Sequence, residues 1–101
     1  MIRHVVALQL NADEPLRRAR DAEEVKRRLE ELSDVNSGII SIDVYFDLGE
    51  ISAHWPLLLV ADYSSRESLE EYQRDPRHRD VVQWMNDGVV SDRVVIDFEI
   101  P

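Results

Sequence analysis

Cysteine is absent from the sequence, glycine and proline are scarce with three and four residues, and lysine occurs once, at Lys26. Without cysteine the chain has no disulfide framework, no thiolate nucleophile and no cysteine-ligated zinc, which is consistent with a reducing compartment. The few glycines exclude a collagen-like polymer and leave no glycine-rich phosphate loop. What remains is an ordinary globular composition, in which 44% of the residues are hydrophobic.

Positive charge is also scarce, because 12 basic residues face 21 acidic ones and the net charge is −9. Nucleic acid and anionic membranes need a clustered positive field, so neither is expected as a partner. No stretch approaches the roughly 20 apolar residues of a membrane helix. The apolar run at the N-terminus is interrupted by Arg3 and His4 and is not typical of a signal peptide. We therefore expect a cytoplasmic protein.

The length of 101 residues suits a single domain, residues 1–101, with one modest core. Alternating apolar residues predict strands over 2–10, 39–48 and 93–100, and a continuous apolar run predicts a further strand over 57–63. An apolar helical stripe predicts a helix after the first strand, beginning either at Pro15 or at an Asp21 capping box. A second helical region begins with a capping box at Ser64, breaks at Asp75-Pro76 and ends near Gly88.

The predicted order is βαββαβ, which is typical of an α+β ferredoxin-like fold with a four-stranded antiparallel sheet and the helices on one face. The other face would then carry an apolar set that no helix covers: Val5, Ala7, Ile39, Tyr45, Leu58, Val60 and Val95. A monomer would expose this patch to water. We therefore predict a homodimer that packs sheet against sheet, as a dimeric α+β barrel.

Four segments resemble the stress-responsive A/B barrel (Dabb) family: IRHVVALQL, SGIISIDVYFDL, LVADYSSRESLEEYQRDPRHRDVV and RVVIDFEI. The resemblance covers nearly the whole chain and implies a dimeric α+β barrel. The family includes stress-induced plant proteins and olivetolic acid cyclase, a cofactor-free enzyme that folds a linear polyketide by aldol condensation. By resemblance, Tyr72 and His78 match the tyrosine and histidine that act on substrate in that cyclase, and His4 matches a histidine of its first strand. Two positions depart from the family pattern, because Leu57 and Pro56 replace polar residues.

The residue pattern places His78 on the same helix face as Val82 and Met85, toward the sheet. In the first helical turn its imidazolium is disfavoured, so a neutral imidazole can act as a base. We expect a binding pocket between sheet and helices, formed by His4, Leu59, Tyr72, His78, Val82 and Met85. No cofactor is expected, and no metal, because no two of the three histidines have the spacing of helical ligands.

Several functions remain open at this point. His78 and Tyr72 can form a structural hydrogen bond at the helix break. They can also line a pocket for a small apolar or aromatic molecule, with no chemistry. A third possibility is a cyclase or aldol-type enzyme that uses His78 and Tyr72 as catalytic residues. By fold analogy alone, a monooxygenase-like activity is a further alternative.

Overall fold

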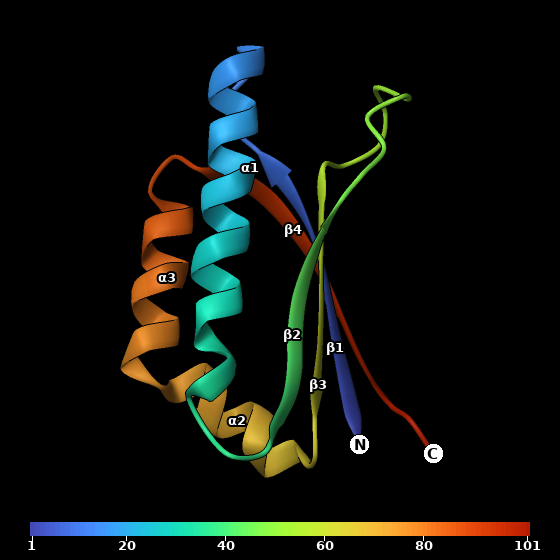
Figure 1. The fold of residues 1–101 in the computed structure, drawn as a ribbon, viewed down its shortest axis with the longest axis vertical. Coiled ribbons are helices and arrows are strands. Elements are labelled where there is room, and N and C mark those ends of the chain that lie inside the picture. Colours follow the sequence, from blue (N-terminus) through green and yellow to red (C-terminus); the bar gives the residue numbers. More distant parts are fainter.

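The computed structural model describes residues 1–101 and contains one four-stranded sheet with helices on one of its faces (Figure 1). The strands are β1 (Ile2–Leu10), β2 (Ile39–Phe46), β3 (Leu57–Tyr63) and β4 (Val90–Glu99). They lie in the order β2-β3-β1-β4, and each neighbouring pair is antiparallel. The predicted ferredoxin-like α+β fold is therefore confirmed.

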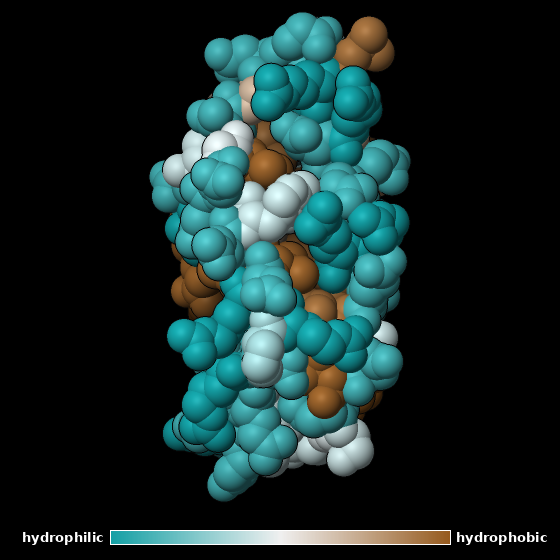
Figure 2. Space-filling model, turned by 90° about the vertical axis from the view of Figure 1, so that its left-hand side faces the viewer, coloured by the Kyte–Doolittle hydropathy of each residue, from teal (hydrophilic) through white to brown (hydrophobic).

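Helices α1 (Pro15–Glu30), α2 (Arg66–Arg74) and α3 (Pro76–Asn86) form the second layer, and a 3-10 turn, η1 (Glu31–Asp34), extends α1. In Figure 1, α1 and α3 run side by side over the sheet, and α2 joins β3 to α3 at one end. The outer surface of this layer is mainly hydrophilic (Figure 2). Apolar side chains of the helices therefore serve mostly to cover the sheet.

The first helix begins at Pro15 rather than at the Asp21 capping box. Glu14 is its N-cap, and the Glu14 carboxylate accepts hydrogen bonds from the backbone N–H groups of Leu16 and Arg17. Proline suits the first helical position because its missing N–H would have no partner there. Asp21 consequently lies within the helix.

The second helical region is broken as predicted, but its first cap is Ser65 rather than Ser64. The Ser65 side chain accepts a hydrogen bond from the backbone N–H of Ser68. Asp75 then caps α3, its carboxylate accepting from the N–H of Arg77, directly before Pro76. This Asp-Pro pair fixes the angle between α2 and α3 and so decides where the first turn of α3 lies.

The core lies between the two layers and follows the alternation of β1, whose even-numbered residues are all buried. Leu59 and Ala61 of β3, together with Val25 and Leu29 of α1, meet them from the neighbouring strand and helix. The strand alternation of the sequence thus selected the helix-covered face correctly for β1 and β3.

Two residues assigned to the uncovered face lie elsewhere. A register shift between Ile39 and Ser41 leaves Ile40 exposed in the bulge and packs Ile39 against the core. Val95 pairs with Val6 of β1 and therefore shares the helix-covered side. The alternation of β4 had been assigned to the sheet faces in the wrong phase.

The uncovered face of the sheet is strongly apolar. Its large exposed side chains are Tyr45, Leu58, Val94, Ile96 and Phe98, and the half-buried Val5, Ala7 and Val60 lie among them. The most exposed of these side chains is Ile96, with 61% of its surface accessible to solvent. We refer to this surface as the open sheet face.

The outer edge of β2 is closed by two side chains of α1. Lys26 Nζ donates to the carbonyl oxygen of Val44 at 2.7 Å, and Glu30 Oε2 accepts from the N–H of Val44 at 3.0 Å. The same two side chains pair with each other at 2.7 Å. The single lysine of the chain therefore ties α1 to an edge strand.

Candidate functional site

A cavity of about 300 Å³ lies between the sheet and the helices, on the side of β4. Most of its lining is hydrophobic, and the polar groups are two histidines, one tyrosine, one glutamine and one arginine. The lining residues are His4, Val6, Leu8, Leu29, Leu59, Tyr72, Gln73, His78, Val82, Met85, Arg93 and Val95. We call this space the histidine cavity.

All six residues that the sequence analysis selected line the histidine cavity: His4, Leu59, Tyr72, His78, Val82 and Met85. They come from β1, β3, α2 and α3. Their binding and catalytic roles remain predictions. Leu57, the departure from the family pattern, is buried in the core and does not line the cavity.

His4 is held from the opposite strand. It is buried in β1, and its Nδ1 lies 2.5 Å from Asp97 Oδ1 of β4. A carboxylate only accepts hydrogen bonds, so Nδ1 of His4 is the donor in this pair. Sequence analysis missed Asp97. The signal that could have found it is the register of β1 with β4, which places Asp97 directly opposite His4.

Tyr72 and His78 meet across the break between α2 and α3. Their ring centroids are 4.4 Å apart, and Tyr72 is buried while His78 is half-buried. His78 Nδ1 donates to the carbonyl oxygen of Gln73 at 3.3 Å. In the neutral ring, Nε2 is then the nitrogen that carries the lone pair. The break capped by Asp75 therefore brings a phenol and an imidazole together.

Burial determines the protonation of these groups. It lowers the pKa of His78, because the charged imidazolium loses its hydration in the half-buried site. Burial likewise raises the pKa of Tyr72, so this phenol keeps its proton near neutral pH. The histidine cavity thus pairs a neutral imidazole with a hydroxyl donor, which is a combination suited to binding an oxygen atom or moving a proton.

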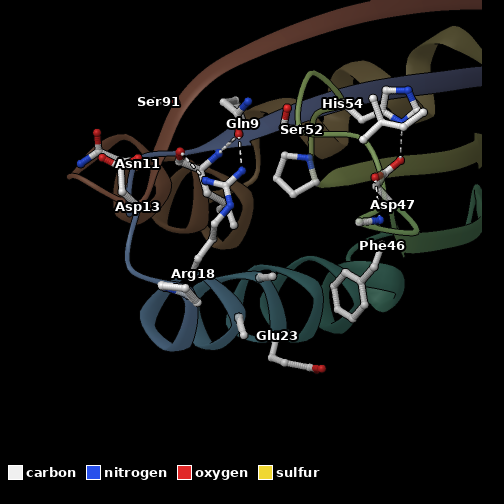
Figure 3. Close-up of a pocket in the computed structure, with 17 residues that line it drawn as sticks. Gln9, Asn11, Asp13, Arg18, Glu23, Phe46, Asp47, Ser52, His54 and Ser91 are labelled. Atoms are coloured by element: carbon white, nitrogen blue, oxygen red, sulfur yellow. Dashed lines mark hydrogen bonds and ion pairs between the residues drawn. The ribbon is translucent and has the colours of Figure 1, made fainter.

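A larger and more open hollow of about 920 Å³ lies at the far end of β1, between α1 and the loop that joins β2 to β3 (Figure 3). Several of its polar side chains already have partners. Arg18 donates to the carbonyl oxygens of Leu10 and Ala12 and to Gln9 Oε1, and His54 lies 3.1 Å from Asp47. None of the predicted site residues lies there.

No group of three or more histidine, aspartate or glutamate side chains is arranged to hold a metal ion. No helix has both the length and the apolar character needed to cross a lipid bilayer.

Comparison with solved structures shows the same fold in several proteins of low sequence identity. The chain is similar to a dimeric protein of unknown function with a ferredoxin-like fold from Bacteroides fragilis, at 20% identity and a TM-score of 0.83, over 98% of this chain and 95% of that one. It is similar to a dimeric ferredoxin-like protein of unknown function from Thermobifida fusca, at 23% identity and a TM-score of 0.80, over 98% and 90% of the two chains.

A third similar structure is a Nitrosomonas europaea protein provisionally described as an antibiotic biosynthesis monooxygenase, at 14% identity and a TM-score of 0.78, over 98% and 97% of the chains. No curated protein sequence matches significantly. The stress responsive A/B barrel domain (Dabb) matches residues 2–100, which is almost the whole chain. This chain therefore belongs to the stress responsive A/B barrel family.

Proposed function

We propose that the histidine cavity binds a small molecule with an apolar or aromatic body and one oxygen acceptor, such as a carbonyl or phenolate. The observation that carries this proposal is the convergence of Tyr72, His4 and His78 in a cavity whose other walls are mainly apolar. The apolar walls favour burial of the ligand body. The Tyr72 hydroxyl then donates to the ligand oxygen, because a buried donor gains most from an anionic or strongly polar acceptor.

Binding of 4-nitrophenol tests this proposal, with 4-nitrotoluene as a ligand of similar shape that lacks the hydroxyl. We expect the wild type to bind 4-nitrophenol more tightly than 4-nitrotoluene. In Tyr72→Phe the ratio of the two affinities should fall about tenfold, which corresponds to about 1.4 kcal/mol. Tyr45→Phe is the matched control, since it removes a phenol hydroxyl from the open sheet face. Equal affinity of wild type and Tyr72→Phe for 4-nitrophenol would contradict the proposal.

We propose further that two chains form a homodimer through the open sheet face. Support comes from the large apolar side chains exposed there, and the Bacteroides fragilis and Thermobifida fusca proteins of the same fold are described as dimeric. A stable dimer needs roughly 1,200 Å² or more of buried surface in total, which a four-stranded sheet face can supply. We place this dimer in the cytoplasm, because a chain without cysteine suits a reducing compartment.

A second candidate function is cofactor-free proton abstraction next to a carbonyl group. It is favoured by one observation: His78 donates through Nδ1 to the Gln73 carbonyl and burial lowers its pKa, so this ring presents an unprotonated Nε2. In this reaction His78 Nε2 takes a proton from the carbon beside the carbonyl. The electron pair of the broken C–H bond moves to the carbonyl oxygen, and the Tyr72 hydroxyl stabilises the resulting enolate.

Exchange of deuterium into the methyl group of acetophenone measures this activity directly by NMR. We expect exchange above the buffer rate with the wild type, and a loss of about 100-fold or more of that excess in His78→Ala. Arg79→Ala, on the exposed side of the same helix turn, is the control. An exchange rate equal to that of buffer would leave the cavity as a binding site only.

A further inference from the structure

Tyr63, the last residue of β3, carries an unusual hydroxyl. The side chain is fully buried, and its oxygen is the one buried side-chain nitrogen or oxygen in the chain that has no hydrogen-bond partner in the protein. An unpaired buried hydroxyl is destabilising, because it has given up its bonds to water without replacement. The packing of the core would be equally served by phenylalanine, so the hydroxyl itself calls for an explanation.

The surroundings of Tyr63 are the polar groups of the histidine cavity. Its ring lies 5.4 Å from the ring of Tyr72 and 6.4 Å from that of His4, measured between centroids. Burial raises the pKa of Tyr63, and the nearby Tyr72 hydroxyl and Asp97 carboxylate raise it further. The hydroxyls of Tyr63 and Tyr72 therefore approach each other, but they do not reach the full geometry of a hydrogen bond. Tyr63 does not line the cavity itself. It therefore lies outside the cavity, next to the lining residues His4 and Tyr72.

A phenol hydroxyl has one proton to donate and lone pairs that accept. When Tyr72 donates its proton to a ligand oxygen, the lone pairs of Tyr72 are left for a second donor. Tyr63 is the nearest candidate, because its ring contacts that of Tyr72 and its own proton is unused. Hydrogen bonds in such a chain polarise and strengthen one another.

We propose that Tyr63 is a positioning residue for ligand recognition: its hydroxyl donates to Tyr72 when Tyr72 donates to the oxygen of a bound phenolate or carbonyl ligand. This inference rests on the proposed function of the histidine cavity. According to this inference, the Tyr63 hydroxyl lowers the stability of the free protein and raises its affinity for the ligand. The two effects have opposite signs, so they can be separated experimentally.

The experiment compares wild type, Tyr63→Phe, Tyr72→Phe and the double variant. For each we measure the Tm without ligand, the Kd for 4-nitrophenol and for 4-nitrotoluene, and the pH at which bound 4-nitrophenol ionises, followed by its absorbance. We expect Tyr63→Phe to raise the Tm by about 5 °C and to weaken 4-nitrophenol binding about fivefold. We also expect its affinity for 4-nitrotoluene to change less than about twofold.

Two more results are expected if Tyr63 acts through Tyr72. Bound 4-nitrophenol should ionise at a higher pH in Tyr63→Phe than in wild type, because its phenolate is less well stabilised. In the Tyr72→Phe background, Tyr63→Phe should leave the Kd for 4-nitrophenol unchanged, because the acceptor of its hydrogen bond is gone.

Each contrary outcome has a distinct meaning. A lower Tm in Tyr63→Phe would show that the hydroxyl already has a partner in the free protein, and would overturn the inference. Unchanged 4-nitrophenol binding in Tyr63→Phe, together with weakened binding in Tyr72→Phe, would overturn the role of Tyr63 and leave the proposed function intact. Unchanged binding in Tyr72→Phe would overturn both.

Discussion

The two histidines of the cavity are held by partners of different kinds. A carboxylate of the facing strand holds His4, whereas a backbone carbonyl of the preceding helix holds His78. Both bonds use Nδ1 of the ring. The carboxylate bond is the shorter by 0.8 Å, since the two distances are 2.5 and 3.3 Å. His4 is therefore the more firmly oriented ring, and His78 the one whose environment is governed by burial.

His78 should titrate below the ordinary histidine value of about 6.5, because burial lowers its pKa. The unfolded chain then takes up this proton first as pH falls. The contribution of His78 to stability is complete above about pH 6.5 and declines below it, until the lowered pKa of the folded state is passed. NMR of the imidazole C–H signals measures the pKa, and urea unfolding from pH 7.5 to 5 measures the decline.

His78→Gln should flatten this decline while leaving the protein folded. If His78 instead titrates at or above 6.5, the neutral imidazole is not favoured by the fold, and the proton-abstraction candidate loses its base.

His78→Ala distinguishes the structural alternative: a large drop in Tm with unchanged 4-nitrophenol binding would identify the histidine as a helix cap. We expect a small drop in Tm, because the 3.3 Å bond to Gln73 is long.

At the scale of elements, the turn before β2 is packed tightly against α2. A Cβ atom at Gly38 would lie 2.6 Å from Cβ of Ser68 and 2.9 Å from Oγ of Ser64. Asn36 fixes the same contact, since its amide accepts from the Ser68 hydroxyl at 2.7 Å and donates to the Ser68 carbonyl at 3.0 Å. The close approach anchors the first turn of α2, at the end opposite the helix break.

Gly38→Ala should therefore destabilise the protein by about 1–3 kcal/mol, the usual effect of overpacking. Thermal unfolding followed by circular dichroism measures the change. Adding Ser68→Gly removes the Cβ that the new methyl group meets, so the double variant should be more stable than the sum of the two single effects. Simple additivity would mean that the turn moves away from α2 at little cost.

The order of the elements follows from sequence alone, because strand and helix periodicities differ and Asp75-Pro76 marks the helix break. Features that depend on how the strands pair cannot be predicted from the sequence in this way. The bulge at Ile40 is fixed by the register with β3, and the contact of His4 with Asp97 joins residues 93 positions apart. The start of the first helix was ambiguous because Glu14-Pro15 and Asp21 both resemble caps.

The candidate site shows the same division. The family resemblance pointed to His4, Tyr72 and His78, and the helix and strand faces placed them beside Leu59, Val82 and Met85 in the cavity lining. Tyr63 escaped notice because a tyrosine at the end of an apolar strand is typical of a core. Only the atomic positions reveal that its ring is packed and its hydroxyl is not paired.

For the whole molecule, the open sheet face decides how the chain exists in solution. Val60→Glu places a charge at the centre of this face, between Val5 of β1 and Asp43 of β2. If two sheets pack there, an unpaired buried charge should weaken the dimer by several kcal/mol. Leu16→Glu is the matched control, because Leu16 is 74% exposed on the helix layer.

Light scattering should give wild type and Leu16→Glu a mass near twice the 11.8 kDa of one chain, and Val60→Glu a mass near that of one chain. Circular dichroism checks that the variant remains folded. A wild-type mass of one chain at micromolar concentration would contradict the proposed dimer, whatever the behaviour of the variant.

The hydrogen bonds of Lys26 and Glu30 to the backbone of Val44 affect whether strands of other chains can add to the β2 edge of the sheet. An incoming strand needs free N–H and C=O groups along an edge, and at Val44 both are already occupied by α1. At Val44 an incoming strand would therefore meet the side chains of α1 in place of free backbone groups. The helix thus hinders, at this position, the edge-to-edge strand addition from which fibrillar polymers grow.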